Sequence, residues 1–582
     1  MTNTKNTYKG IAAAPGITIA RAYQYTKKIE KVQDELISDI DEALLNLDEA
    51  LNKSKKELLK VFSLAVDKLG ENRASIFEAQ IMILDDPVLI DTIRRRIKEE
   101  KRHPEFIVDD EISKYQALMN EAQEAYMKER SHDIEDIKNR IIRNLKKKKW
   151  QSRITNDVIV ISDYLTPADT VLFARVNVKG YITNFGGLTS HAAIVARSLN
   201  IPAIVGLHEA TNKIKNNDLL VLDGFHGTVI INPSEKQINY YREKIEQLRI
   251  YDEELAELKN EPAVTTDNKE ILLQANLDLT EEIALVVQNG AKGIGLVRTE
   301  QLFQEYDVFP EEEVQYNIYR EIAEKVYPEK VIIRTLDVGG DKVLPVDVKE
   351  PNPFLGWRGI RFLLDNMDLF KTQIRAILRG SEHKNLKMMI PMVCSIKEVR
   401  KFKKIVDECK EDLRERGLPF DNDIDLGIMI EVPSAAVMAR EYAEEVDFIS
   451  IGTNDLIQYL LAVDRGNEIV SDLYQEFHPS VVRTIGHIIK EAKNTGKCMV
   501  SLCGEMGADT LAVPLLVGLG LDSLSVSASA IPTIKKIIRN LSYEETRALA
   551  EKCLTFRTEK EIRNELIQFF DNLQNISVHK IF

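Results

Sequence analysis

The sequence predicts a multidomain α/β protein in which a small α/β domain holds an inserted helical bundle and is joined by a linker helix to a C-terminal TIM (β/α)8 barrel. The chain has 582 residues, enough for three or four domains. Between two β-rich stretches, residues 34–149 repeat apolar side chains at helical spacing. After residue 262, apolar strands alternate with amphipathic helices, as a parallel barrel requires.

The first half of the chain alternates between strand and helix patterns. Residues 8–24 are typical of a short strand pair. Helical stretches are expected at 73–83, 88–100, 109–148 and 191–199, and strands at 157–162, 180–183, 202–205 and 218–222. We therefore expect an α/β domain of residues 1–28 and 150–233, interrupted by a helical domain of residues 29–149. Residues 234–261 are charged and poor in glycine, which indicates a connecting helix.

Residues 262–582 are expected to form the barrel. Its candidate strands are 271–275, 293–297, 331–335, 388–393, 427–432, 447–451, 498–502 and 522–526. In such barrels the chemistry lies at the carboxyl ends of the strands. The polar residues that follow these strands are therefore the first candidates for a site.

Composition excludes several classes of protein. A formal net charge of -14 argues against nucleic acid as the main partner, because phosphate backbones need clustered Lys and Arg. The five cysteines form no CxxC pair, which fits free thiols in a reducing cytoplasm. The sequence shows neither a secretory signal nor an apolar stretch long enough to span a bilayer, so we expect a cytoplasmic protein without membrane insertion.

The segment from Gly186 to Arg197, Gly-Gly-Leu-Thr-Ser-His-Ala-Ala-Ile-Val-Ala-Arg, is the first chemical candidate. Thr189 or Ser190 can cap a helix that begins near His191. A helix N-terminus favours a phosphoryl group and disfavours imidazolium, so His191 would be a neutral nucleophile. The plainer interpretation is a first-turn histidine that merely faces solvent.

A second candidate lies at the expected strand ends of the barrel. Charged and polar residues there are Arg298, Arg334, Asp337, Arg358, Glu431, Asn454, Asp455, Arg465 and Cys503. Several arginines at one mouth indicate a small anion with more than one charge. Two carboxylates among them suit Mg²⁺, which completes its shell with substrate oxygens and water. A strand-end thiol can donate a proton. Taken singly, each residue could equally form a structural salt bridge or belong to the core.

These motifs resemble those of Enzyme I of the bacterial phosphoenolpyruvate:sugar phosphotransferase system, and the resemblance covers nearly the whole chain. It begins with Gly10-Ile-Ala-Ala-Ala-Pro-Gly and Ile76-Phe-Glu-Ala-Gln. It continues through the Thr-Ser-His segment, Gly339-Gly-Asp-Lys and Asn352-Pro-Phe-Leu-Gly-Trp-Arg. Its most specific parts are the histidine segment and Ile451-Gly-Thr-Asn-Asp-Leu-Ile-Gln-Tyr.

The resemblance implies a role for each candidate residue. His191 would be phosphorylated by phosphoenolpyruvate, with Thr170 near its other ring nitrogen. Arg298, Arg334, Arg358 and Lys342 would hold the phosphate, and Arg465 and Asn454 the carboxylate. Glu431 and Asp455 would bind Mg²⁺, and Cys503 would protonate the enolate as pyruvate forms. The helical insert would dock the histidine-containing phosphocarrier protein HPr, and the barrel would form a homodimer.

The chain departs from the family pattern at a few positions. Val297 and Gln301 flank Arg298-Thr-Glu where the family often has Tyr and Phe, and Gln80 stands where a histidine is common.

Two alternatives stay open on the sequence. Pyruvate phosphate dikinase and phosphoenolpyruvate synthase share the histidine and barrel motifs, but they need a large nucleotide-binding domain before the histidine. Only about 190 residues precede His191, and they contain no phosphate loop. A catalytically silent regulatory homologue is the other alternative, and the complete set of candidate residues argues against it.

Overall fold

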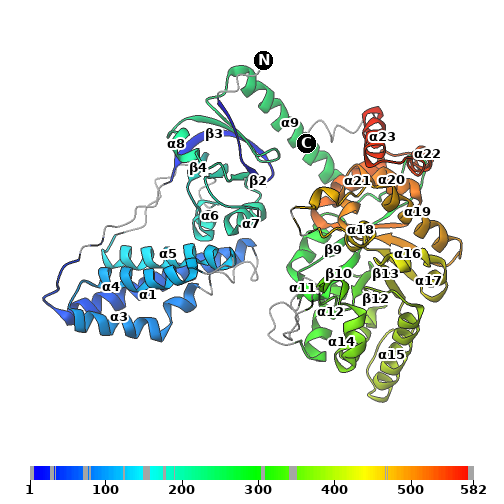
Figure 1. The fold of residues 1–582 in the computed structure, drawn as a ribbon, viewed down its shortest axis with the longest axis horizontal. Coiled ribbons are helices and arrows are strands. Elements are labelled where there is room, and N and C mark those ends of the chain that lie inside the picture. The colour runs from blue at the N-terminus through cyan, green and yellow to red at the C-terminus, as the bar shows by residue number, and fades with distance from the viewer. Residues whose placement is uncertain are drawn as a thin grey trace. The chain divides into compact units, whose positions relative to one another are not determined.

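The structure is a computed structural model that describes most of the chain, in two compact units divided between Arg249 and Ile250. The described residues are 6–25, 32, 34–69, 77, 80–121, 125–148, 157–174, 178–188, 190–302, 309–339, 350, 352–465, 467 and 469–573. Figure 1 labels the helices and strands along the chain.

The first unit contains an eight-stranded sheet in the order β1-β8-β7-β3-β4-β5-β6-β2 (Figure 1). Its strands are β1 Thr7–Lys9, β2 Ile11–Ala14, β3 Ile17–Gln24, β4 Val158–Ser162, β5 Gly180–Thr183, β6 Ala203–Val205, β7 Leu219–Asp223 and β8 Thr228–Ile231. Strands β3 to β6 are parallel, and the other pairings are antiparallel. The short strand β8 was not expected from the sequence, and three strands replace the expected pair within residues 8–24.

The helices that pack on this sheet come between its strands in the order of the chain. They are α6 Pro167–Ala174, α7 His191–Ser198 and α8 Ala210–Lys213, and α7 matches the helix expected at 191–199. Buried residues of α6 and α7, among them Phe173, Ala193 and Ala196, pack with Val158 and Val160 of β4 in one core. The helix that begins at His191 is therefore fixed to the sheet along its buried side.

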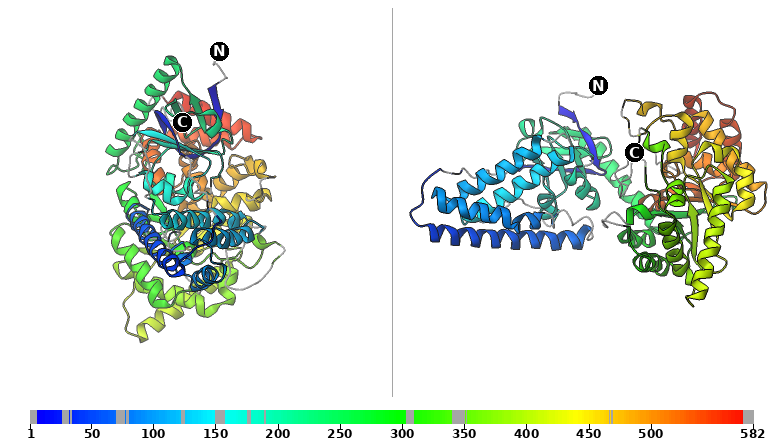
Figure 2. Two further views of the ribbon diagram at one scale, coloured as in Figure 1. Left: turned by 90° about the vertical axis from the view of Figure 1, so that its left-hand side faces the viewer. Right: turned by 60° about the horizontal axis from the view of Figure 1, so that its bottom comes forward.

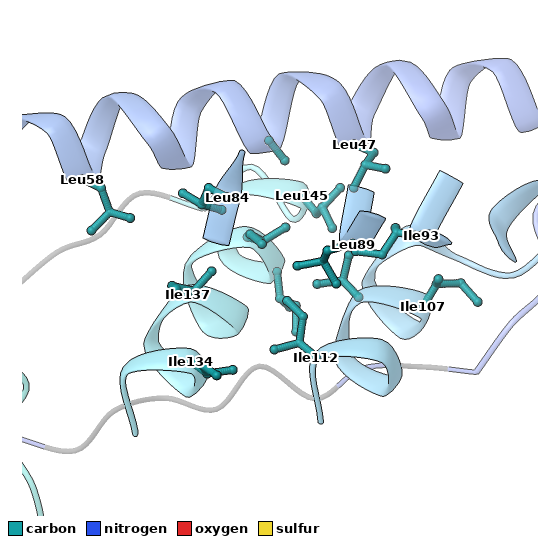
Figure 3. Packing of buried hydrophobic residues seen from close by; sticks show 14 of the residues in the cluster. Leu47, Leu58, Leu84, Leu89, Ile93, Ile107, Ile112, Ile134, Ile137 and Leu145 are labelled. Atoms are coloured by element: carbon teal, nitrogen blue, oxygen red, sulfur yellow. The ribbon is translucent and has the colours of Figure 1, made fainter. Parts of the chain in front are cut away.

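The helical insert consists of α1 Ile40–Leu69, α3 Pro87–Glu100, α4 Pro104–Glu121 and α5 Ala125–Leu145. Their apolar faces meet in one core, part of which is drawn in Figure 3. Ala168 of α6 and Val195 of α7 belong to the same core. The insert is thereby packed against the helix that begins at His191.

Two expectations for the insert need comment. A single helical stretch over 109–148 is wrong, because α4 and α5 are separate helices that pack against each other. No glycine or proline marks the division, so the sequence alone gave no signal for it. The stretch expected at 73–83 lies largely outside the described residues. Within it, Gln80 is buried, with 2% of its surface exposed.

The second unit is built on a closed barrel of parallel strands in the order β10-β11-β12-β13-β14-β15-β16-β9. The strands are β9 Leu272–Leu277, β10 Ile294–Arg298, β11 Val331–Arg334, β12 Leu386–Ile390, β13 Leu426–Ile430, β14 Phe448–Ile451, β15 Met499–Leu502 and β16 Ser523–Ser527. The predicted fold class is confirmed, and each strand begins within two residues of its expected start.

Helices surround the barrel strands (Figure 2). They include α10 Ile283–Gln288, α11 Thr299–Leu302, α12 Glu312–Val326, α13 Ile360–Asp365, α14 Met367–Gly380, α15 Ile396–Glu415, α16 Pro433–Val437, α17 Ala439–Glu445, α18 Thr453–Leu461, α19 Pro479–Lys493, α20 Ala512–Leu519, α21 Ile531–Arg539, α22 Tyr543–Cys553 and α23 Glu559–Asn572. None of the described helices in either unit combines the length and apolar character needed to cross a membrane.

The connecting helix α9 spans Glu235–Glu257, somewhat less than the expected 234–261. A buried lysine satisfies carbonyls just beyond its end. The Lys535 Nζ donates to the carbonyl oxygens of Leu258 at 3.2 Å, Lys259 at 2.8 Å and Gly290 at 2.9 Å. Carbonyls at a helix end have no partner within the helix. The ammonium binds two of them beyond α9 and one beyond α10, and so fixes the point where the chain leaves α9.

A carboxylate held by three arginines offers a stability test of the barrel unit. Glu312, at the start of α12, accepts hydrogen bonds from Arg375 at 2.6 Å, Arg379 at 2.9 Å and Arg416 at 3.0 Å. Burial opposes the charge, but the three arginines outweigh it and lower the pKa of Glu312 to about 2. The pKa of Glu312 is lower in the folded protein than in the unfolded one, so its charged form contributes to the free energy of unfolding. This contribution is fully present above about pH 4.5 and is lost as the pH falls toward 2.

Glu312→Gln is expected to lower the free energy of unfolding by roughly 2–3 kcal/mol at pH 7. The difference from the unmodified protein should shrink as the pH falls from about 4.5 toward 2, and urea unfolding at pH 7, 4 and 3 measures it. Glu313→Gln is the matched control, because its side chain is largely exposed and bonds to Arg379 alone among these arginines. A loss of equal size in both variants, or one that does not change with pH, would contradict the assignment.

Candidate active site

The first candidate centres on the start of α7. The helix begins at His191, and Ser190 is its N-cap, with an extended backbone and an Oγ that accepts from the Ala193 N–H at 3.4 Å. Gly186 has a φ of 117°, which favours glycine, and a Cβ at Gly187 would meet nothing within 4 Å. The space beside Gly187 is therefore not filled by any described residue, and the first helical turn can present backbone N–H groups to an anion.

Further contacts hold this helix in place. Arg197, in its last turn, donates to the carbonyl oxygens of Ala13 and Leu188, each at 2.7 Å. These two bonds tie α7 to strand β2 and to the loop that precedes His191. The backbone at residue 191 is thus fixed from both ends of the helix.

Thr170 lies on α6, which packs against α7. It is fully buried, and its hydroxyl donates to the Thr166 carbonyl at 3.0 Å, while Tyr181 donates to the Thr170 carbonyl at 3.0 Å. The Thr170 oxygen keeps acceptor capacity. Its expected contact with the His191 ring stays a prediction, because that side chain lies outside the described part of the structure.

The second candidate lies at the carboxyl ends of the barrel strands, where polar residues were expected. Arg298 and Arg334 are the last residues of β10 and β11, and Glu431 and Cys503 directly follow β13 and β15. Asp455 stands in the first turn of α18, which follows β14. Five strand ends therefore direct chemistry-bearing residues to one rim of the barrel.

Arg334 is buried between carboxylates. Its guanidinium bonds to Glu300 and lies 3.2 Å from Asp337. Burial disfavours the charge, but Glu300, Asp337 and Glu431 outweigh it and raise the pKa of Arg334. The buried Nε–H finds no hydrogen-bond partner among the described residues. Because an unmet buried donor is costly, this N–H is well placed for a bound anion.

Arg298 is less enclosed than Arg334. Its side chain is 28% exposed and reaches Asp278 at 3.4 Å, a weak contact. Val297, beside it, is fully buried in the barrel wall. Arg298 therefore keeps donors available toward the mouth of the barrel.

Arg358 is held between two aspartates. It donates to Asp337 through Nε and Nη2 and to Asp455 through Nη1 and Nη2, all at 3.0 Å. Its Nη1 also donates to the Tyr459 hydroxyl at 3.3 Å. These bonds use all five N–H groups of a guanidinium. The expected contact of Arg358 with a phosphate would therefore require one of them to break.

Glu431 and Asp455 form the candidate metal site. Glu431 is 1% exposed and accepts from the Met392 N–H at 2.6 Å. Burial raises the pKa of Glu431, and the charges of Asp455 and Asp337 raise it further. A cation beside this pair would relieve that repulsion. Among the described residues no group of three or more His, Cys, Asp or Glu is placed to hold a metal. Mg²⁺ takes only one or two protein carboxylates, and Glu431 and Asp455 are the two that the sequence predicts for it.

Cys503 lies at the same rim and is 2% exposed. Burial raises the pKa of its thiol, while the nearby charges of Arg334 and Arg298 act in the opposite direction. The thiol is therefore protonated at neutral pH. A protonated thiol beside two arginines can give a proton to an anionic carbon.

Asn454 and Arg465 stand on α18 and after it. Asn454 exchanges hydrogen bonds with Glu505, donating to its carboxylate at 3.1 Å and accepting from its N–H at 2.8 Å. Arg465 is half-buried, and its backbone N–H donates to Gln458 at 3.2 Å. Lys342 lies outside the described residues. Gln301, on α11, is half-buried.

The carboxylates that pair with the arginines were the main omission of the sequence analysis. Asp337 was expected at a strand end but was given no role, Glu300 was noted only as a motif neighbour, and Tyr459 was not singled out. Their signal is positional, because Asp337 follows a strand-end arginine by three residues and Glu300 follows another by two. The mouth is therefore a mixed arrangement of arginines and carboxylates and not a uniformly basic surface.

Comparison with known proteins agrees with this arrangement. A family model described as "PEP-utilising enzyme, PEP-binding domain" matches residues 252–543. The corresponding "N-terminal" and "mobile domain" models match residues 9–130 and 154–227. All three descriptions name enzymes that use phosphoenolpyruvate.

Curated relatives match over nearly their full length. The phosphoenolpyruvate-protein phosphotransferase of Geobacillus stearothermophilus is 42% identical over 566 residues, covering 96% of this chain and 97% of that protein. The protein of the same name from Bacillus subtilis is 41% identical, covering 95% and 98%. That of Mycoplasma capricolum is 41% identical, covering 97% and 99%. This chain belongs to the phosphoenolpyruvate-protein phosphotransferase family.

Proposed function

We propose that this chain transfers the phosphoryl group of phosphoenolpyruvate to His191, releases pyruvate, and passes the group to the histidine-containing phosphocarrier protein HPr. The observation that carries the proposal is the pairing, in one chain, of a capped helix that starts at a histidine with a barrel mouth of arginines and carboxylates. Full-length relatives named as phosphoenolpyruvate-protein phosphotransferases support the same reaction.

The mouth of the barrel would bind the substrate by its two charged ends. Arg298, Arg334 and Lys342 would hold the phosphate, with the Arg334 Nε–H, which has no partner among the described residues, as one donor. Arg465 and Asn454 would hold the carboxylate. Glu431 and Asp455 would hold Mg²⁺, which neutralises charge on phosphate oxygens when bound.

The transfer itself balances without a further reagent. A neutral ring nitrogen of His191 attacks phosphorus, a nitrogen–phosphorus bond forms, and the bond from phosphorus to the enol oxygen breaks. The electron pair goes to the enolate, whose methylene carbon takes the Cys503 proton to give pyruvate. Water then reprotonates the thiolate.

The helical insert is proposed to dock HPr. Its core includes Val195 of α7, so a protein bound on the insert would lie near the helix that begins at His191. We assign residues 1–28 and 150–233 to the phosphohistidine domain and 29–149 to the carrier-binding domain. Residues 234–261 would be the linker helix, and 262–582 the barrel and homodimer domain of a cytoplasmic enzyme.

The direct test is incubation with labelled phosphoenolpyruvate and Mg²⁺, followed by mass spectrometry under neutral or basic handling. We expect acid-labile phosphate on His191, one pyruvate released per phosphoryl group, and loss of the label on addition of HPr. Phosphorylation from ATP without a carrier would instead favour a dikinase-like enzyme. Binding of HPr without pyruvate release would favour a regulatory homologue.

Cys503→Ala is expected to slow pyruvate formation about 100-fold, the usual size of a general-acid contribution. Phosphoenolpyruvate affinity should change little, because the thiol acts after the bond to phosphorus breaks. A coupled assay of pyruvate release measures the rate. Cys498→Ala is the control, since Cys498 precedes the same strand at its other end. Equal rates in the Cys503 variant and the unmodified protein would remove Cys503 from the mechanism.

A further inference from the structure

Two buried arginines at the barrel mouth differ in one respect that decides their roles. Arg334 keeps a buried Nε–H without a partner among the described residues, whereas every N–H of Arg358 is bonded to protein. Both side chains are nearly inaccessible, with 4% and 2% of their surfaces exposed. A ligand can therefore use Arg334 as it stands, but not Arg358.

The backbone around Arg358 is shaped to keep it there. The Gly359 N–H donates to the Val338 carbonyl at 3.1 Å, which joins the Arg358 segment to the loop after β11. In that loop Gly339 has a φ of 104°, and a Cβ there would lie 2.3 Å from the Trp357 carbonyl. This close approach of two chain segments places the guanidinium against Asp337.

Arg358 also holds the start of α18. Asp455 and Tyr459 lie one turn apart on this helix, and both accept from the Arg358 Nη1. The Tyr459 hydroxyl in turn donates to the Phe354 carbonyl at 2.5 Å. The first turn of α18 is thus attached at two points to the segment that carries Arg358.

The Asp455 carboxylate has lone pairs beyond those that Arg358 uses. Each of its oxygens accepts one bond from Arg358, and each carboxylate oxygen has two lone-pair positions. Among the described residues no other side chain is hydrogen-bonded to Asp455, so the remaining positions can bind a metal that Glu431 would also hold. Residues that orient a metal ligand in this way commonly change metal affinity 10- to 100-fold when replaced.

We propose that Arg358, held by Asp337, is a positioning residue that presents Asp455 to the divalent cation, and that it does not bind the substrate phosphate. This rests on the proposed function, in which Glu431 and Asp455 hold Mg²⁺. It replaces the role that the family resemblance implied for Arg358.

The test separates metal binding from phosphate binding in the full-length protein. Mn²⁺, which takes the same oxygen ligands as Mg²⁺, is titrated without substrate and followed by electron paramagnetic resonance. Phosphoenolpyruvate is titrated at millimolar concentration in EDTA by calorimetry. The variants are Arg358→Lys, which keeps the charge but cannot form two hydrogen bonds to each of two carboxylates, and Asp337→Asn, which keeps the shape.

Both variants are expected to weaken Mn²⁺ binding about tenfold or more and to leave metal-free phosphoenolpyruvate binding within about threefold. Their effects should not add in the double variant, because one contact is lost in each case. Arg361→Lys is the matched control, since its Nη1 donates only to the Leu355 and Gly356 carbonyls among the described backbone groups, each at 3.0 Å. Its Mn²⁺ affinity should not change.

Unchanged Mn²⁺ affinity in Arg358→Lys would overturn the proposal, as would a large loss of phosphoenolpyruvate binding in EDTA. A general loss of folding would lower the affinity for both ligands and would change the near-ultraviolet circular dichroism spectrum. If Arg358→Lys fails to fold, the isosteric variant Asp337→Asn tests the proposal in its place. Failure of the proposed function is a separate outcome, because it would appear as a lack of His191 phosphorylation in the unmodified protein.

Discussion

Replacing His191 by alanine is expected to abolish phosphorylation of the protein by phosphoenolpyruvate completely. In the proposed reaction the phosphoryl group becomes bonded to the protein only at this ring. Transfer of the group to water instead would leave no label on the protein. The helix should survive the change, because its cap is the bond from the Ala193 N–H to the Ser190 Oγ and alanine is a strong helix former. Incorporation of labelled phosphate after denaturation measures the effect.

The neighbouring histidine His226 gives a matched control in the same unit. Its Nδ1 lies 3.0 Å from Asp223 and its side chain is half-exposed. His226→Ala should retain full labelling, because a histidine held in a turn after β7 has no part in the proposed transfer. Label that persists in the His191 variant, or that disappears in the His226 variant, would place the acceptor elsewhere.

Arg334→Gln is expected to lower kcat/KM for phosphoenolpyruvate about 1,000-fold, equivalent to roughly 4 kcal/mol. The change removes a donor to the phosphate and takes the buried cation away from Glu300, whereas Asp337 keeps its bonds to Arg358. The Glu300 carboxylate would then repel the substrate. Loss of one partner from a buried ion pair also costs roughly 3–5 kcal/mol of stability, so kinetics must be accompanied by thermal unfolding.

An arginine outside the barrel mouth separates the two effects of that change. Arg375→Gln also breaks an ion pair, the one between α14 and Glu312, and should lower stability without changing kcat/KM. Arg334→Lys keeps the charge and should recover part of the activity. A kcat/KM that stays within tenfold of the unmodified protein in Arg334→Gln would remove this residue from phosphate binding.

Most of the fold could be predicted from the sequence, because strands and helices alternate regularly in the barrel unit. Each barrel strand is a short apolar run that an amphipathic helix follows. Because parallel strands covered by helices are buried on both faces, such runs can be recognised in the sequence. Strand β8 was missed although Asp223-Gly224 and Gly227 mark a turn between β7 and its four residues, Thr228–Ile231. The division between α4 and α5 was missed because no turn residue marks it.

The sequence could predict the candidate site only as a set of residue types at strand ends. Which arginine pairs with which carboxylate depends on side chains that are far apart in the chain, as with Arg358 and Asp455. Local pattern carries no information on such pairs. For this reason the sequence treated Arg334 and Arg358 alike, although one has an unmet donor and the other has none.

The order of strands in the first unit has a consequence during translation. Strand β3 pairs with β4 on one side and β7 on the other, so residues 17–24 wait for residues 219–223 to leave the ribosome. At cellular synthesis rates, the roughly 200 intervening residues take about 10–40 seconds. Once residues 158–162 have emerged and β4 pairs with β3, the other side of β3 is an exposed edge until β7 follows, open to aggregation or to a chaperone, although the helical insert is by then fully synthesised.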